Sequence, residues 1–238
     1  MRIVVNPLKF QIMKITFGAL VTDGRGKLGG HVASKNVGGA FLRTKVTPAN
    51  PQTTDQQNVR NAFGTNSQAW RGLTESQRLA WNNATVDFPS VKDGNSIILS
   101  GQMLYSKLNG NLAAAGQALI ANPPLPVAVP ELLLESVTAD VSDTEIEITA
   151  SEATVPAGFS MIVEATGPYS PGRFNVKNRF RSLGVAVLVA GVVDIYTAWN
   201  AKYGTLVAGQ KLSVRIKLVS NTTGIAGVPS AQSTIIVA

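Results

Sequence analysis

Apolar residues in the middle of the chain, from about residue 54 to residue 120, recur at the spacing of an amphipathic helix. Val59, Phe63, Trp70 and Leu73 are separated by three, four or seven positions. Residues spaced in this way share one face of a helix, because the α-helix repeats every 3.6 residues. The pattern therefore predicts a first helix that contains both Val59 and Leu73.

Two further helices are predicted from the residues at their ends. Thr-Glu-Ser-Gln at 74–77 fits a capping box, in which the first and last side chains satisfy the backbone at the start of a helix. A third helix is predicted over residues 100–115, because Leu104 and Leu108 share a face and Gly116 suits a helix stop.

The period of the apolar pattern changes from helical to two after the proline-rich segment 121–130. Strands are predicted at 132–142, 144–151, 158–166, 184–193 and 211–220. The run at 184–193 is the longest apolar stretch and is predicted to be a buried strand. Successive strands without intervening helices indicate an antiparallel β-sandwich over residues 131–238.

The N-terminal part of the chain lacks a repeating apolar face. Residues 24–39 are rich in glycine, and their apolar content is too small to offset the entropy of ordering the backbone. We therefore expect an arm that becomes ordered against partner subunits. Residues 41–46 alternate apolar and basic side chains, which suits the addition of a strand to the sheet edge of another subunit.

Together these patterns predict an α+β chain in four parts. They are an extended, basic, glycine-rich arm (1–53), a helical docking region (54–120), a proline-rich linker (121–130) and a C-terminal antiparallel β-sandwich (131–238).

Charge is concentrated in the arm. The chain has a net charge of +7, and residues 1–60 hold nine lysines and arginines against two acidic residues. Such an arm can meet nucleic acid, an acidic protein surface or a membrane surface. The membrane is disfavoured, because the arm has no amphipathic helical stripe. Neither a signal peptide nor a transmembrane segment is predicted, because no apolar run approaches the roughly 20 residues of a membrane span.

Catalytic chemistry finds little support in the sequence. The chain has no cysteine, which excludes disulfides and thiolate metal sites. His31 is the single histidine and has no carboxylate beside it in the sequence. The alternation of Glu145 and Glu147 with isoleucines fits a strand with one wet face better than a pair of catalytic carboxylates. We expect no catalytic residue, no cofactor, no metal and no small-molecule substrate, and therefore a protein that is not an enzyme.

Partner contact is the role expected of two groups of residues. In the arm and the first helix, the candidates are Arg25, Lys27, Lys35, Phe41, Arg43, Lys45, Trp70 and Arg71. Trp70 and Trp81 also suit the core of a small helical hairpin, and this interpretation is favoured for them. A loop predicted over residues 169–182 carries Arg173, Lys177, Arg179 and Arg181. This loop is a candidate surface for a glycan or a partner, although solvated basic side chains explain it as well.

Three motifs in residues 24–112 resemble a family of uncharacterised proteins of tailed bacteriophages. After the glycine-rich segment come Pro-x-Asn-Pro-x-Thr at 48–53, Trp-Arg-x-Leu-Thr-x-x-Gln-Arg-x-x-Trp at 70–81 and Ser-Gly-x-x-x-Tyr-x-x-x-Asn at 100–109. The resemblance implies a structural protein of the virion, made in the host cytoplasm and assembled with copies of itself and other virion proteins. A tail or neck position is favoured over a capsid accessory position.

The C-terminal part resembles an immunoglobulin or fibronectin type III module by its strand pattern alone, because it lacks the Cys…Trp…Cys spacing of immunoglobulin domains. Two other functions stay open. The chain suits a carbohydrate- or receptor-adhesion module that binds through residues 169–182, or a packaging accessory whose arm contacts DNA. A protein neighbour is favoured over DNA as the partner of the arm.

Overall fold

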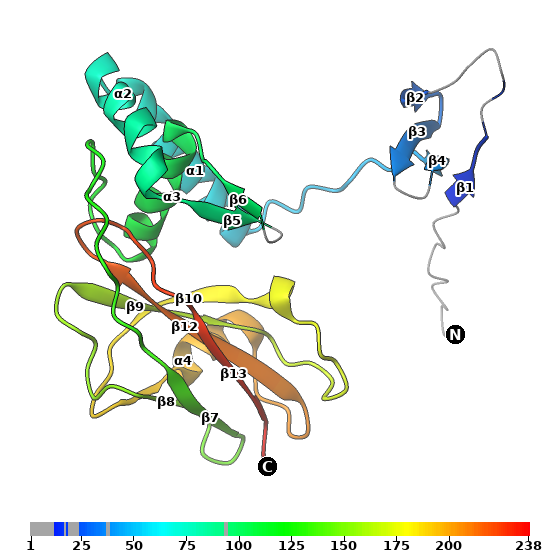
Figure 1. Ribbon diagram of the computed structural model, residues 1–238. Helices are drawn as coiled ribbons and strands as arrows, with labels where there is room; N and C mark the ends of the chain where they lie inside the picture. Colours follow the sequence, from blue (N-terminus) through cyan, green and yellow to red (C-terminus); the bar gives the residue numbers. More distant parts are fainter. Residues whose placement is uncertain (1–11, 17, 19–23, 37–38, 93–94) are drawn as a thin grey trace, which may run out of the picture. The chain divides into compact units, whose positions relative to one another are not determined.

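The computed structural model describes residues 12–16, 18, 24–36, 39–92 and 95–238. Contacts within the chain divide it into two units, Met1–Thr53 and Thr54–Ala238. The described residues combine helices with antiparallel sheets, as the α+β prediction requires (Figure 1).

The first unit contains a small antiparallel sheet. Its strands are β1 (Ile12–Lys14), β2 (Gly26–Leu28), β3 (His31–Asn36) and β4 (Gly39–Thr44), in the spatial order β1-β4-β3-β2. Gly29, with φ of 55°, and Gly30 form the two-residue turn between β2 and β3, where a positive φ favours glycine. The expectation of an extended arm is therefore corrected for the residues of this sheet. Gly29 and Gly30 of the glycine-rich segment close the hairpin of β2 and β3.

The second unit begins with the three expected helices, α1 (Thr54–Gly72), α2 (Glu75–Ala84) and α3 (Gly101–Ala114). The capping box is confirmed: the Gln77 backbone N–H donates to Thr74 Oγ1, and the Thr74 backbone N–H donates to Gln77 Oε1 over 2.9 Å. Between α2 and α3 lie a short 3₁₀ helix, η1 (Thr85–Asp87), and a hairpin of β5 (Ser90–Lys92) and β6 (Asn95–Ile97).

The rest of the second unit contains two antiparallel sheets. The strands are β7 (Leu134–Asp140), β8 (Glu145–Ala150), β9 (Phe159–Ala165), β10 (Arg181–Ala186), β11 (Val192–Asp194), β12 (Lys211–Ser220) and β13 (Ser230–Ile235). One sheet has the order β10-β9-β12-β13 and the other has the order β11-β8-β7. Two short helices, η2 (Lys177–Arg179) and α4 (Tyr196–Tyr203), lie in the connections.

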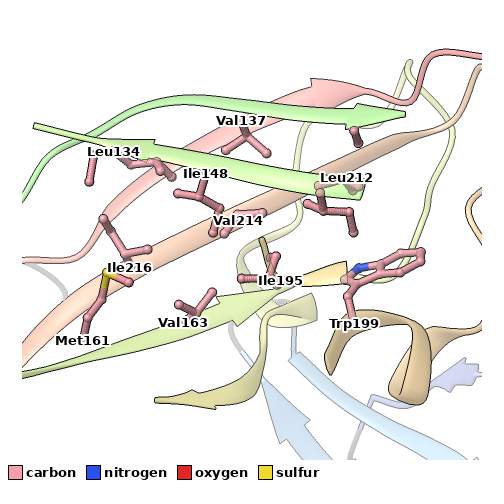
Figure 2. Close-up of a cluster of buried hydrophobic side chains, with 14 of the residues drawn as sticks. Leu134, Val137, Ile148, Met161, Val163, Ile195, Trp199, Leu212, Val214 and Ile216 are labelled. Carbon is pink, nitrogen blue, oxygen red and sulfur yellow. The ribbon is translucent and has the colours of Figure 1, made fainter. Parts of the chain in front are cut away.

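The core of this region lies between the two sheets (Figure 2). Ile146 and Ile148 of β8 face it, while the glutamates between them stay partly exposed. Val214 and Ile216 of β12 face it from the other sheet. Trp199 of α4, a helix that the sequence pattern did not indicate, is fully buried there. Its indole N–H donates to the Thr166 carbonyl over 2.9 Å.

The two sheets are joined along one side and open along the other. Where β7 and β13 meet, the Leu134 backbone N–H donates to Ser230 Oγ and the Val237 backbone N–H donates to the Ala139 carbonyl, each over 3.0 Å. At the opposite side lie β10 and β11, each the outer strand of its sheet. The apolar run at 184–193 is therefore not the single buried strand that was expected, because it is divided between these two outer strands.

Of the three helices, α3 is the one that packs against the two-sheet region, at β12 and the connection that follows it. The Asn111 side-chain amide donates to the Gly224 carbonyl over 2.8 Å. A Cβ at Gly224 would lie 2.2 Å from the Leu108 carbonyl oxygen, so this close approach needs glycine. The proline-rich segment 121–130 thus connects α3 to β7 within one unit. Among the described residues, no helix has the length and apolar character needed to span a membrane.

Candidate partner-binding surfaces

Lysine and arginine side chains lie together on one face of the sheet in the first unit. Residues directly opposite each other in an antiparallel sheet point to the same side. Val32 is opposite both Lys27 and Arg43, which places these two predicted partner-binding residues on one face. Phe41, two residues before Arg43 and opposite Lys14, lies on the same face. This side of the sheet, which we call the basic face, combines three cations with an aromatic ring.

The opposite face of the sheet is less charged. Leu42 is opposite Ala33, and Lys35 is opposite Ala40. The register therefore separates Lys35 from the cations of the basic face. Arg25 and Lys45 lie just outside the strands and are exposed.

A core is missing from this sheet in the described residues. Each side chain whose exposure is described between residues 14 and 53 is exposed or only partly buried. Sheets of this size need an apolar face packed on another element for independent stability. The strand addition expected of residues 41–46 is not what the pairing shows, because β4 is already bonded to β1 on one side and β3 on the other. Among the described residues, both edges of β4 are therefore occupied within the chain.

The tryptophans of the helical region form a core, as favoured from the sequence. Trp81 is fully buried, and its indole N–H donates to the Ala121 carbonyl over 2.8 Å. Its ring packs edge-on against Tyr105, with ring centroids 5.3 Å apart, and Trp70 contacts the same tyrosine from α1 at the same distance. Arg71 is exposed.

The first half of α1 presents apolar side chains that nothing in the described residues covers. Val59 is 71% exposed and Phe63 is 66% exposed, although both continue the stripe that buries Asn66 and Leu73 further along the helix. The sequence predicted this apolar stripe along α1. It did not show which part of the stripe is buried, because that depends on how far the neighbouring helices extend along α1. We call Val59 and Phe63 the α1 patch.

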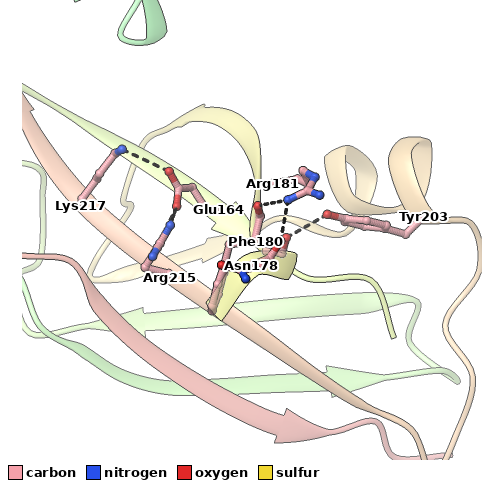
Figure 3. A network of polar contacts seen from close by, with 8 residues as sticks. Glu164, Asn178, Phe180, Arg181, Tyr203, Arg215 and Lys217 are labelled. Atoms are coloured by element: carbon pink, nitrogen blue, oxygen red, sulfur yellow. Dashed lines mark hydrogen bonds and ion pairs between the residues drawn. The ribbon is translucent and has the colours of Figure 1, made fainter. Parts of the chain in front are cut away.

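The basic loop predicted at 169–182 is exposed at each of its four cations. Arg179, Arg181 and Tyr203 line a shallow cleft of about 280 Å³. The Arg181 guanidinium donates to the carbonyls of Asn178 and Phe180, which fixes its position (Figure 3). Phe174 of this loop, which the sequence analysis did not single out, is 90% exposed.

Beside this loop, a partly buried network of ion pairs joins two strands. The Glu164 carboxylate of β9 pairs with Arg215 and with Lys217 of β12, the latter over 3.1 Å (Figure 3). Burial raises the pKa of Glu164, but hydrogen bonds and attraction from the two cations outweigh it and lower the pKa. The Arg215 guanidinium also lies 4.6 Å from the centre of the Phe180 ring, which attaches the end of the loop to the sheet.

An acidic face covers part of the other sheet. Glu145 is opposite Asp140 and Glu147 is opposite Thr138, all on the side away from the core. The stretch 108–172, which includes β7, β8 and β9, contains eight acidic residues and no lysine or arginine. We call the outer side of β7 and β8 the acidic face. Its carboxylates alternate along a strand, as expected from the sequence.

Metal-binding and catalytic clusters are not apparent in the described part of the chain. His31 lies in β3, opposite Thr44 and Leu28. No group of three histidine or acidic side chains that could hold a metal ion occurs among the described residues.

Comparison of the chain with protein-family models, with characterised proteins and with solved structures finds no match.

Proposed function

We propose that this chain is a non-enzymatic structural protein of a tailed-phage virion, in the tail or neck or as a capsid accessory. It assembles in multiple copies through its first unit, which takes a stable form on a neighbour. The observation that carries this proposal is the sheet of β1 to β4, in which no described side chain is buried. The described residues supply no apolar core for this sheet, and the surface of a neighbour would supply the apolar contacts that a sheet of this size needs.

The distribution of charge supports a protein as the neighbour of the arm. Residues 54–238 contain thirteen basic and thirteen acidic residues, so the net charge of +7 belongs to residues 1–53. The acidic face of a second copy offers the opposite charge. Complementary charge of this type guides the encounter and fixes the register of an interface.

The helical region provides a second surface for contact with a neighbouring protein. The α1 patch is apolar and exposed, and it follows directly after the segment that joins the first unit to the helices. An amphipathic helix that leaves its own core in this way suits a groove on a neighbouring virion protein.

For residues 131–238 we propose an immunoglobulin or fibronectin type III type of sandwich. The alternation of the strands between the sheets supports it, because the first, second and fifth strands form one sheet and the third, fourth, sixth and seventh form the other. The helix α4 is an addition to that pattern.

Adhesion to a carbohydrate or receptor is the second candidate function. It is favoured by the exposed Phe174 beside four cations and by the cleft that Arg179 and Arg181 line. Binding of the chain to host glycans, lost on combined replacement of Arg179 and Arg181 by alanine, is the outcome that this candidate requires.

Contact with packaged DNA is the remaining alternative for the arm. Lys14, Lys27 and Arg43 on the basic face would then neutralise phosphates, and the affinity would fall steeply as salt increases. Retention of duplex DNA by the chain at physiological salt would support this alternative over a protein neighbour.

Deletion of residues 1–53 tests the proposed assembly. We expect residues 54–238 to keep their unfolding midpoint, because the buried cores lie within the second unit, and to be lost from purified particles. A mass-spectrometric census of particles, with copy number, measures incorporation. Unchanged incorporation of the shortened chain would contradict the role of the first unit.

A further inference from the structure

An uncharged run of twelve residues lies at the open side of the two-sheet region. Residues 182–193 contain no charged side chain. They form most of β10, a turn and the start of β11. Three valines of this run point away from the core: Val185 is 48% exposed, Val187 is 70% exposed and Val189 is 73% exposed. Val185 lies in β10, the outermost strand of its sheet, and Val187 and Val189 lie in the segment that follows it. The Val189 backbone exchanges two hydrogen bonds with Val192, so the unpaired backbone ends before Val189.

The backbone of this strand is also available. In the described part of the chain, β10 pairs only with β9, from Arg181 to Ala186. Its beginning is covered, because Lys202 of α4 donates to the Ser182 carbonyl over 3.1 Å and a bulge interrupts the register between Ser182 and Gly184. After Gly184 the strand has none of the charged or proline residues that normally block edge-to-edge pairing.

An apolar cleft runs beside the same strand. It has a volume of about 440 Å³ and is lined mainly by Leu183, Val185, Val193, Ile195 and Ala198. Side chains of an added strand alternate between its two faces, so every second residue of a partner at β10 would enter this cleft.

The charges at the two ends of the run are opposite. Arg181 is exposed at the start of β10. At the far end, the Gly191 backbone N–H donates to the Ala153 carbonyl over 2.7 Å, which holds the exposed Glu152 beside the turn. In an antiparallel pair of identical strands, the start of each strand meets the end of the other. Arg181 of each copy then lies near Glu152 of the other copy, which gives two such contacts in the dimer.

We propose that β10 is a self-association edge, on which the β10 strand of a second copy pairs antiparallel about a twofold axis. The two four-stranded sheets then form one continuous sheet, and Val185 and Val187 of both copies are buried together, with Val189 beside them at the turn. The contact is isologous, so it closes as a dimer and does not propagate as a fibre. The lack of charge between the ends and the opposite charges at the ends both favour a second copy as the occupant.

This interface does not depend on the proposed role of the first unit. Its residues lie at 181–193 and at Glu152, all within the second unit. Association through the first unit is removed by deletion of residues 1–53, whereas association through β10 persists in the shortened chain.

Introduction of a charge into the edge tests the proposal. The full chain and Val187→Lys are compared by sedimentation over a range of concentrations, with Val228→Lys as the matched control, because Val228 is 86% exposed and lies elsewhere. We expect the variant at Val187 to self-associate about tenfold more weakly or worse. In the register that brings Arg181 to the turn at Gly191, Val187 is opposite Val185 of the second copy, so the substitution would bury a charge among valines in each half of the interface. The control keeps the wild-type association. Equal association of all three proteins, or a wild-type chain that stays monomeric, would overturn the proposal.

A charge exchange tests the antiparallel register. Arg181→Glu and Glu152→Lys are each expected to weaken the dimer, and the double variant is expected to restore it, because the end pairs are re-formed with reversed sign. Circular dichroism confirms that each variant is folded. A double variant that associates no better than either single variant would overturn the twofold antiparallel pairing.

Discussion

At the scale of single residues, the polar side chains of the interior are held by specific partners. Among the described residues, no buried side-chain nitrogen or oxygen lacks a hydrogen-bond partner. The fully buried Asn109 shows why. Its amide accepts from the Ile120 backbone N–H over 2.7 Å and donates to the Ile120 carbonyl over 3.2 Å, which fixes the chain as it leaves α3. A buried polar group of this kind stabilises one conformation because any alternative leaves it unpaired.

Glu164 provides a prediction at this scale. Glu164→Gln removes the charge that Arg215 and Lys217 share, and we expect a loss of about 1–2 kcal/mol in the free energy of unfolding at pH 7. Because the folded pKa of Glu164 lies below its ordinary value of 4.5, its stabilisation is fully present above pH 4.5 and is lost as the pH falls through the folded pKa.

Urea unfolding at pH 7 and at pH 3 measures this effect. The difference in stability between wild type and Glu164→Gln should shrink at the lower pH, while Glu135→Gln, an exposed change on β7, should have little effect at either pH. A gap between wild type and Glu164→Gln that is equally large at both values would rule out the ion pairs as its source.

At the scale of the elements, the sequence predicted best those helices whose ends are marked by residues close in the sequence. Thr74 and Ser100 mark the starts of α2 and α3 through their own capping hydrogen bonds, so these helices are visible without knowledge of the fold. The signal at the start of α4 is weaker, because Ile195 at the N-cap position has no capping side chain. Asp194, one residue earlier, takes that role, and its carboxylate accepts from the Tyr196 backbone N–H over 2.8 Å. The helix is held by the burial of Trp199, a contact with strands distant in the sequence.

The apolar run at 184–193 shows the limit of pattern reasoning. Its composition predicts a strand, but whether that strand is central or outermost depends on which strands pair beside it. The first unit shows the same limit, because the register that places Lys27 and Arg43 on one face arises from pairing between strands. The candidate residues of the arm were thus visible in the sequence, and their arrangement on a surface was not.

The α1 patch provides a prediction at the scale of elements. Phe63→Ser should change the free energy of unfolding of the isolated chain by less than about 0.5 kcal/mol, because the Phe63 side chain is 66% exposed. If the patch meets a neighbour, the same change should reduce incorporation into particles.

The matched contrast is Leu104→Ala in α3. Leu104 is fully buried, so this change should lower the free energy of unfolding by about 2–5 kcal/mol. Thermal unfolding separates the two cases. Wild-type incorporation of a stable Phe63→Ser chain would exclude the patch as a docking surface.

At the scale of the whole molecule, stability and charge are divided between the two units. The second unit holds the described buried cores and has equal numbers of basic and acidic residues. The first unit carries the net charge and has no described buried side chain. Such a division suits a molecule in which one part is stable alone and the other is completed by a neighbour.

Amide hydrogen exchange of residues 24–45, in the isolated chain and in the assembled particle, tests this division most directly. We predict fast exchange of these amides in the isolated chain, because the described side chains form no core that protects their strand pairing, and strong protection after assembly. The amides of β8 and β12 should be protected in both states and serve as the internal reference. Strong protection of residues 24–45 in the isolated chain at high dilution would contradict the account, because the first unit would then be stable without a partner.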